Sequence, residues 1–357
     1  MATILDYIAW RGDLPFSSSE FSDVDALIFT QLSYIDFSGA VSSDMKECVT
    51  LKQAAKKVLA EGERPLGAVL PEDITELLKA AAASRRFCDI GLSGFVNRID
   101  IENEEQFSAV LFHIGRSIFV AYRGTDDTIV GWKEDFNLSY MDSVPAQREA
   151  AEYLNKAMSA YRFVPFFAGG HSKGGNLSVY AAANISPRHK RRIKKVFNFD
   201  GPGFPEELIK TPEYEEIGGK VINILPEGSI VGRLFSACGK EKIVSCKENL
   251  IMQHVAFGWQ VLGGAFVTAD GPNDGSVAVD RVLSGWIADM TNQEREALVE
   301  ALFEVFKSSE AKTLTDIIND KLGFMKAIGS VSKDKKRDIR KYMAKILEQA
   351  AKYMIKN

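Results

Sequence analysis

Residues 163–184 read FVPFFAGGHSKGGNLSVYAAAN, and this stretch decides the expected fold. The apolar run 163–168 is typical of a buried strand, and the small residues of 176–184 are typical of a closely packed helix. The glycine-rich residues between them indicate a sharp turn. A strand, a sharp turn and a helix form the setting of a nucleophile elbow, in which a strained serine projects above a sheet.

The turn contains a G-x-S-x-G motif, Gly170-His171-Ser172-Lys173-Gly174. Residues two positions from the serine must be small, and Gly170 and Gly174 meet that requirement. We expect Ser172 Oγ to project beside the N-terminus of the next helix, whose free N–H groups favour a developing negative charge. The alternative is a glycine-rich loop without chemistry, but the flanking strand and helix favour an elbow with Ser172 as the nucleophile.

A serine hydroxyl needs a general base, and the chain contains four histidines. His113 lies inside an expected strand, and His171 belongs to the elbow and should point into local packing. His189 stands in a basic segment that we expect to be a solvated turn. His254 follows the last expected core strands, where the base of a serine–acid–histidine order belongs. We therefore predict His254 as the base, with a buried structural histidine as the alternative.

Two acidic residues are candidates to orient this base. Asp200 follows the expected strand 194–199, and catalytic groups in open α/β sheets gather at the carboxyl ends of strands. Asp200 is therefore the first choice, and Glu227, after the expected strand 220–225, is the second. The structural alternative for Asp200 is a cap of the Gly-Pro-Gly turn that follows it.

An oxyanion in acyl transfer needs two hydrogen-bond donors. The backbone N–H of Lys173, directly after the serine, is the first expected donor. Thr125 is the second, through its N–H and with its hydroxyl as a further donor, because it follows the expected strand 117–122. A turn capped by Asp126 or Asp127 fits the same residues about as well.

The rest of the chain surrounds the elbow with strands and helices. Residues 107–123 predict a β-hairpin, and the alternating elements that follow predict parallel strands. We therefore expect an α/β fold with a mixed, mostly parallel central sheet. Helices are expected near 22–36, 44–61, 71–86, 146–161 and 174–185, and strands near 162–168, 194–199 and 220–225.

Three regions are expected along the chain. Residues 1–100 should form an N-terminal helical region packed on the core, and residues 101–285 the α/β core. Residues 286–357 should form a C-terminal helical region that is a candidate cap or lid. Thr291 with Glu294 predicts a capping box at the start of its first helix.

The composition narrows the class of protein. With 46% hydrophobic and 26% charged residues, the chain is globular and not disordered. A net charge of −4 gives no global attraction to nucleic acid. No signal peptide or membrane-spanning run is evident, and four cysteines without metal-like spacing suggest reduced thiols in a cytoplasmic protein. We expect no metal and no cofactor. The sequence does not indicate the oligomeric state.

Several motifs resemble known lipases. Val120-Ala121-Tyr122-Arg123-Gly124-Thr125, then Trp132 with Asp135, then the elbow, resemble the core of the class 3 (fungal-type) lipases. The chain is still more similar to a family of uncharacterised bacterial lipase-like proteins. That similarity spans roughly residues 5–267 and rests on the elbow, 6–14, 32–37, 198–204, 229–232, and Gln253-His254 with Trp259. The resemblance implies an α/β-hydrolase fold and a Ser-Asp-His triad that cleaves acyl esters.

Two positions depart from the class 3 pattern. Lys173 stands where those lipases usually carry leucine, so its cation is expected either to attract an anionic substrate group or to form a surface salt bridge. Ser229 stands where their acid is expected, which favours Asp200 over Glu227 as the acid.

The resulting expectation is a lipase- or esterase-like serine hydrolase that acts on a small-molecule acyl ester or a lipid. An acyltransferase or thioesterase would use the same residues. The alternative from another class is a non-catalytic binding protein on the same scaffold. Lys and Arg outnumber Asp and Glu in the amphipathic stretch 331–357, which would suit peripheral membrane contact, but a packed terminal helix is preferred.

Overall fold

In the computed structural model, the chain folds around one eight-stranded sheet whose strands lie in sequence order. The structure describes residues 2–62, 72–309, 311–320, 326, 329, 332–337, 340–342, 344–345 and 348. The strands of the sheet are β1 (Val49–Thr50), β2 (Gly91–Asp100), β3 (Glu105–Ile114), β4 (Ser117–Tyr122), β5 (Phe166–His171), β6 (Ile193–Phe199), β7 (Val221–Pro226) and β8 (Lys240–Val244). A small second sheet pairs β9 (Val261–Leu262) with β10 (Ala265–Phe266).

The sheet is mixed, with its antiparallel pairs at one side. Strands β1 to β4 pair antiparallel, and β4 to β8 pair parallel. The β3–β4 hairpin turns at Gly115 and Arg116, where Gly115 has a φ of 57°. The segments between consecutive parallel strands return the chain to the same end of the sheet, so that each strand runs in the same direction. The strand order and the strand–turn–helix elbow identify an α/β-hydrolase fold, so the predicted fold class is confirmed.

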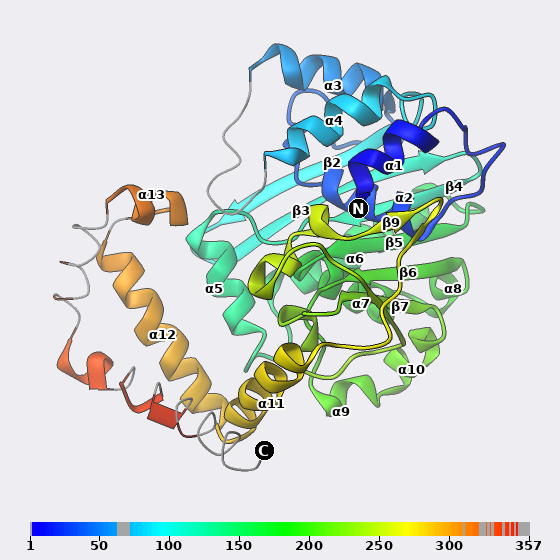
Figure 1. The fold of residues 1–357 in the computed structure, drawn as a ribbon. Helices are drawn as coiled ribbons and strands as arrows, with labels where there is room; N and C mark the ends of the chain where they lie inside the picture. The colour runs from blue at the N-terminus through cyan, green and yellow to red at the C-terminus, as the bar shows by residue number, and fades with distance from the viewer. Residues whose placement is uncertain are drawn as a thin grey trace.

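Helices cover both faces of the sheet (Figure 1). Helices α1 to α4 pack on one face with apolar side chains of β2 to β6, and α6, α7 and α10 pack on the other. The helices are α1 (Ile4–Arg11), α2 (Asp23–Leu32), α3 (Leu51–Ala60), α4 (Asp73–Ala83), α5 (Ile129–Asn137), α6 (Pro145–Ala160), α7 (Lys173–Asn184), α8 (Pro187–Lys190), α9 (Glu206–Ile209), α10 (Pro212–Gly218), α11 (Asp274–Ala288), α12 (Asn292–Ser308) and α13 (Leu314–Asn319). Short 3-10 helices are η1 (Val231–Arg233), η2 (Leu250–His254) and η3 (Ala256–Gly258).

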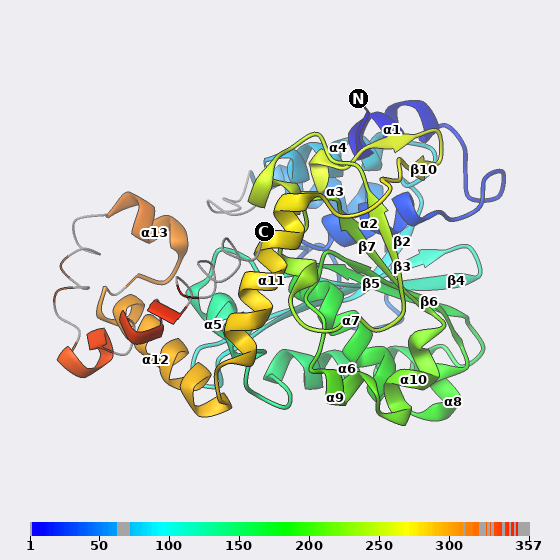
Figure 2. The ribbon, with the colours of Figure 1, turned by 60° about the horizontal axis from the view of Figure 1, so that its bottom comes forward.

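The C-terminal helices lie beside α5, at the carboxyl ends of the parallel strands (Figures 1 and 2). Lys133 of α5 pairs with Glu300 of α12 at 2.7 Å, and the rings of Phe136 and Phe303 are 5.8 Å apart. The predicted capping box of Thr291 with Glu294 is present. Most of the basic stretch 331–357 lies outside the described residues.

The N-terminal segment is tied to the segment that carries His254. The N–H of Val261 donates to Ala2 O at 2.9 Å, and Trp10 Nε1 donates to Gly263 O at 3.2 Å. Ala2 and helix α1 therefore both contact the region of the β9–β10 hairpin.

Two parts of the secondary-structure prediction are wrong. The helix expected near 44–61 begins only at Leu51, after strand β1. Residues 91–100, expected within the N-terminal helical region, form strand β2. Gly91, Gly94 and the polar residues at its end interrupt the alternation that marks a strand, and β2 and β3 pair through a register shift between Ser93 and Val96. Helix α1 lies within the region 1–100 that is expected to be helical, although the sequence analysis gives it no bounds of its own.

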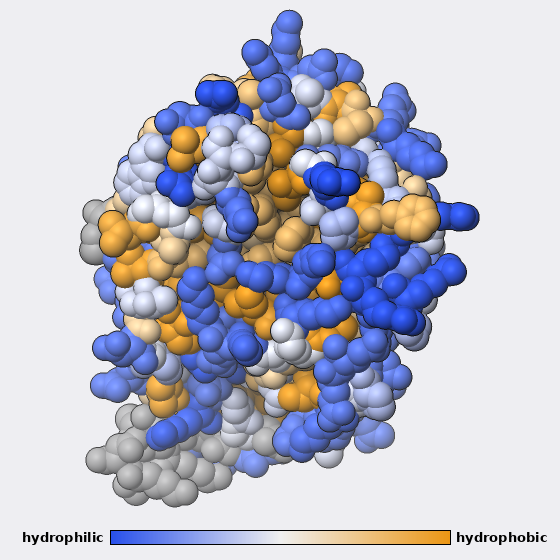
Figure 3. Space-filling model, turned by 90° about the vertical axis from the view of Figure 1, so that its right-hand side faces the viewer, coloured by the Kyte–Doolittle hydropathy of each residue, from blue (hydrophilic) through white to orange (hydrophobic). Residues whose placement is uncertain are grey.

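At the end of the sheet remote from the elbow, hydrophilic side chains surround and cross several hydrophobic patches (Figure 3). This view faces α8 and the amino-terminal ends of the parallel strands. The exposed cations of this end include Arg116, Arg162, Arg188, Arg191 and Lys194. Within the residues that the structure describes, no helix has both the length and the apolar character needed to cross a bilayer. All four cysteines are free.

Candidate active site

Ser172 stands at a strained turn between β5 and α7. Strand β5 ends at His171, α7 begins at Lys173, and Ser172 between them has a φ of 57° and a ψ of −132°. This region is unfavourable for a residue with a side chain. A Cβ atom on Gly170 would lie 2.1 Å from the carbonyl carbon of Gly174, and one on Gly174 would lie 2.2 Å from Tyr122 O. The close approach of strand and helix explains why both positions are glycine.

Asp200 and His254 meet beside this turn, although 54 residues separate them. His254 Nδ1 lies 2.6 Å from Asp200 Oδ2, so the imidazole donates to the carboxylate. The Asp200 side chain is fully buried, whereas that of His254 is 24% exposed. Asp200 Oδ1 also accepts from the Ser229 hydroxyl and from Gly232 N–H. The carboxylate is therefore held in one orientation by donors on both oxygens.

The structure places the other candidate acid elsewhere. Glu227 Oε1 lies 3.5 Å from Cys246 N, and no contact with His254 is found in the described part of the chain. The alternative role of Asp200 as a turn cap falls to Asn198, whose Oδ1 accepts from Gly201 N–H at 2.9 Å. The Ser229 hydroxyl donates to Asp200.

His171 packs behind the His254 segment. Its Nε2 lies 2.8 Å from the carbonyl oxygen of His254 and must donate to it, so Nδ1 accepts from Tyr34 Oη at 3.3 Å. The two imidazole rings lie 4.7 Å apart. Burial, and then the neighbouring His254, lowers the pKa of His171 to about 3. His171 is therefore neutral across the physiological pH range.

The loop after β4 runs directly beside Ser172. A Cβ atom on Gly124 would lie 3.3 Å from Ser172 Cβ, so the backbone of this loop borders the serine. The Thr125 hydroxyl donates to Asp135 Oδ2 at 2.5 Å and is not free to serve as a further donor beside the N–H. Asp126 caps the turn by accepting from Thr128 N–H at 2.9 Å. The turn interpretation is thus correct for Asp126, and the Thr125 N–H remains the candidate donor.

Asp135 is an unusual carboxylate. One quarter of its side chain is exposed, but Oδ1 is buried without a hydrogen bond within the described structure. Burial raises the pKa of Asp135 to about 6, although the nearby Lys173 opposes this rise. The hydrogen bond to Thr125 fixes the side chain against the loop.

Lys173 occupies neither of the two expected environments. Its side chain is 1% exposed and its ammonium donates to Glu134 Oε2 at 2.9 Å, to Gln106 Oε1 at 2.8 Å and to Gln106 O at 3.0 Å. Both sequence-based expectations, a substrate-binding cation and a surface salt bridge, are wrong. The side chain reaches into the interior, where Gln106 of β3 and Glu134 of α5 provide the acceptors for its ammonium.

His113 and His189 lie outside the candidate site. His113 Nε2 contacts Ser93 Oγ at 2.8 Å in the sheet, as expected for a strand residue. The expectation that His189 is solvated is wrong: it is 6% exposed and its Nδ1 lies 3.0 Å from Asn155 Oδ1. Helix α8, which begins at Pro187, turns the side chains of His189 and Lys190 inward, while Arg188 and Arg191 remain exposed.

Sequence reasoning missed the residues that support the site. Glu134, Gln106 and Tyr34 contact it through the fold alone, with no spacing that connects them to the elbow. Asn176 donates to the carbonyl oxygens of Pro202 and Gly203, which fixes the turn after Asp200. The only sequence feature that points to Asn176 is its position at the end of the Gly-His-Ser-Lys-Gly-Gly-Asn stretch.

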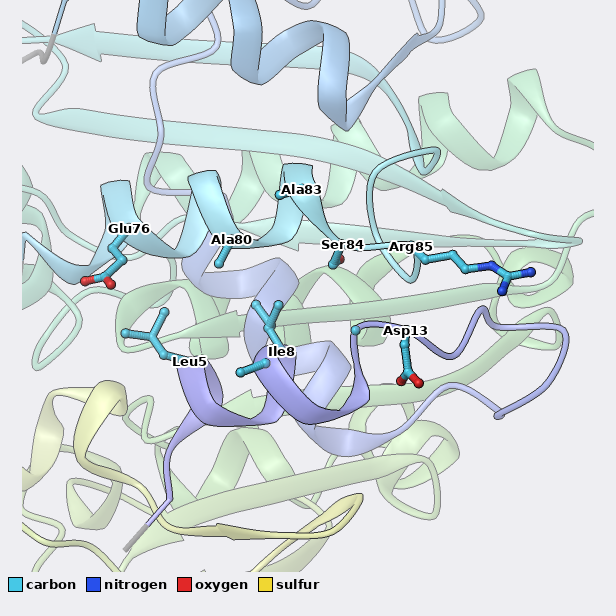
Figure 4. A pocket seen from close by; sticks show the side chains of 10 residues that line it. Leu5, Ile8, Asp13, Glu76, Ala80, Ala83, Ser84 and Arg85 are labelled. Atoms are coloured by element: carbon cyan, nitrogen blue, oxygen red, sulfur yellow. The ribbon is translucent and has the colours of Figure 1, made fainter.

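A separate groove lies between α1 and α4 (Figure 4). It has a volume of about 500 Å³, with Leu5 and Ile8 on one side and Ala80 and Ala83 on the other. None of the candidate site residues lines it. The groove is a packing seam of the N-terminal layer, distinct from the region around Ser172.

Comparisons with known proteins relate this architecture to solved structures. The Lip2 lipase from Yarrowia lipolytica shares 14% identity over 50% of this chain and 82% of its own, with a TM-score of 0.34. A mutant form of MDLA from Penicillium cyclopium shares 10% identity over 70% of this chain and 86% of its own, with a TM-score of 0.37. The Rhizomucor miehei lipase in its propeptide complex shares 14% identity over 67% of this chain and 80% of its own, with a TM-score of 0.37.

The sequence comparison, unlike the structural one, shows the family of the chain. No curated protein matches the sequence. Residues 81–304 match the family described as Mbeg1-like, and this range includes the elbow, Asp200, His254 and α5. The matched residues make up more than half of the chain, which therefore belongs to the Mbeg1-like family.

Proposed function

We propose that the protein is a serine hydrolase that cleaves acyl esters through Ser172. The observation that carries this proposal is the partly buried Asp200–His254 hydrogen bond of 2.6 Å beside a serine held at a φ of 57°. A strained serine conformation costs about 1–3 kcal/mol and persists where the surroundings enforce it. A catalytic serine gives this arrangement a physical purpose that a glycine-rich connecting loop lacks.

The roles follow from the contacts. Ser172 Oγ attacks the ester carbonyl carbon while His254 Nε2 takes its proton, and the resulting imidazolium is stabilised by Asp200. No hydrogen bond joins Ser172 Oγ to Nε2 in the described structure, and such bonds tighten when substrate is bound. The oxyanion accepts from the N–H groups of Lys173 and Thr125. His254 then protonates the leaving alcohol, and water releases the acid from the acyl-enzyme.

An acyl ester, including a lipid ester, is the substrate class that this chemistry fits. It agrees with the motifs shared with lipases, and the roles assigned here require neither a metal nor an organic cofactor. The cytoplasmic location expected from the sequence stays a prediction, as does a role of residues 286–357 as a lid.

The experiment is labelling with a fluorophosphonate probe, read by intact mass. We expect one adduct on the wild type and none on Ser172→Ala or His254→Ala. Ser284→Ala is the matched control, because Ser284 is an exposed serine that donates to Asp280 at 2.9 Å with no described histidine contact. It should label like the wild type.

A second pair of variants decides the acid. Asp200→Asn should slow labelling by about 10³-fold or more, because the imidazole loses its orienting carboxylate. Glu227→Gln should label at the wild-type rate. An unlabelled wild type that binds acyl ligands and loses binding in Ser172→Ala would instead favour a binding protein on this scaffold.

A further inference from the structure

The residue after the proposed nucleophile places a cation in the interior of the protein. Lys173 and Glu134 have side chains that are 1% and 0% exposed, and they pair at 2.9 Å. The three protons of an ammonium group can each be donated once, and three acceptors surround Lys173 Nζ. Glu134 is equally satisfied: Oε1 accepts from Ala146 N–H at 2.8 Å and Oε2 from Gln106 N–H at 3.1 Å.

This ion pair connects the two segments that hold the proposed oxyanion donors. One donor is the N–H of Lys173 itself, at the start of α7. The other is in the loop before α5, where Thr125 donates to Asp135, the neighbour of Glu134 in the sequence. Lys173 Nζ is also 4.0 Å from Asp135 Oδ1. A continuous chain of polar contacts therefore runs from α7 through α5 to Thr125.

Stability alone does not account for such a pair. Removing two charges from water is expensive, and replacement of a buried ion pair by neutral groups is often neutral or stabilising. An ion pair with fixed geometry does, however, fix the relative position of the elements that carry it. The spacing of two oxyanion donors is a property that needs such fixing, because the donors must be in place before charge develops.

We propose that Lys173 and Glu134 are a positioning pair that sets the spacing between the Lys173 N–H and the Thr125 N–H. The proposal rests on the proposed function, since it assigns these N–H groups to the oxyanion. The pair acts by holding α5 and its preceding loop against the first turn of α7. Neither side chain touches the substrate, so both are positioning residues.

The test compares single and paired substitutions. Lys173→Met leaves a buried carboxylate without its cation and should lower Tm strongly. The neutral pair Lys173→Met/Glu134→Gln should recover much of that loss. We expect the neutral pair to retain the wild-type KM for a short-chain p-nitrophenyl ester but to lose about 10²-fold in kcat, as expected when donors are misplaced by about 1 Å.

A second readout does not depend on activity. Amide hydrogen exchange of residues 123–128 should be faster in the neutral pair than in the wild type, because the loop has lost its connection to α7. The matched control is Lys190→Met. Lys190 is also a buried lysine paired with a glutamate, Glu216 at 3.2 Å, but it lies at the opposite end of the sheet. This variant should lower Tm yet leave kcat and the exchange of 123–128 unchanged.

The two readouts separate the possible failures. A stably folded neutral pair with wild-type kcat and wild-type exchange at 123–128 overturns the positioning role. A wild type that neither labels nor hydrolyses esters refutes the proposed function instead. In that case the exchange of residues 123–128 still decides whether the ion pair fixes the loop: faster exchange supports the structural connection, and unchanged exchange refutes it.

Discussion

Ser172 has a backbone conformation that favours glycine. Its φ of 57° is imposed by the junction of β5 and α7. Replacement by glycine removes the steric cost, whereas replacement by alanine keeps it. We predict that Ser172→Gly is more stable than Ser172→Ala by about 1 kcal/mol.

Urea unfolding of the two variants measures this difference, and both lack the hydroxyl, so the comparison isolates the backbone. Equal stabilities would mean that the turn relaxes without the serine and stores no strain. A residue that is unfavourable for stability yet present at the turn supports a functional reason for the serine.

His171 makes stability dependent on pH. Its pKa is lowered from the ordinary value of 6.5 to about 3, mainly by burial. The unfolded chain binds a proton at this residue below pH 6.5, whereas the folded chain does so only near pH 3. Stability is therefore full above the unfolded pKa and is lost as the pH falls toward the folded one, by up to about 5 kcal/mol in total.

We predict that His171→Gln flattens this dependence. The glutamine amide can still donate to the His254 carbonyl but does not titrate. Unfolding free energies measured from about pH 4 to about pH 8 should fall less steeply toward acid in the variant than in the wild type. Parallel curves would show that His171 does not stay neutral in the folded protein.

The sequence identifies residues whose role is local and misses those whose role is tertiary. Ser172 follows from a five-residue motif, and Asp200 from its position after a strand. The environment of Lys173 could not be predicted, because its partners Gln106 and Glu134 lie 67 and 39 residues away. The motif reveals that a lysine follows the serine but not which way its side chain points.

At the scale of elements, periodic segments are predictable and irregular ones are not. The β3–β4 hairpin, α6, α7 and the strands β6 and β7 lie within a few residues of their predicted bounds. Strand β2 escapes prediction because its bend at Gly94, with a φ of 65°, and its polar end disrupt the alternation of a half-buried strand. Pairing with β3 overrides this weak local signal.

The contact of α12 with α5 leads to a prediction about the C-terminal helices. Phe303 is 6% exposed and its ring lies 5.8 Å from Phe136. Phe303→Ala should weaken the packing of α12 by about 3 kcal/mol. Tryptic cleavage at Arg295 and Lys307 should become faster. Leu262→Ala, at a side chain that is 75% exposed, is the control and should cleave at the wild-type rate. Unchanged cleavage of Phe303→Ala would show that this ring contact does not hold α12.

At the scale of the molecule, the N-terminal layer serves as a support for the sheet. A buried ion pair of 2.6 Å between Asp25 and Arg86 joins α2 to the segment after α4. Apolar side chains of this layer and of the sheet form one continuous cluster. The composition predicts enough apolar residues for a large core. It does not predict which helices cover which face of the sheet, because that depends on tertiary contacts. The exposed cations at one end of the sheet coexist with a net charge of −4, which is the sum over the whole chain.

The bonds from Ala2 to Val261 and from Trp10 to Gly263 join the first segment that is synthesised to one that is synthesised much later. The elbow leaves the ribosome well before the segment that carries His254. A nascent chain of this length presents Ser172 without its proposed base. We expect His254 to reach its final position only after β9 and β10 have been synthesised and have packed against α1. On the proposed function, Ser172 therefore becomes reactive only after the segment that carries His254 has been made.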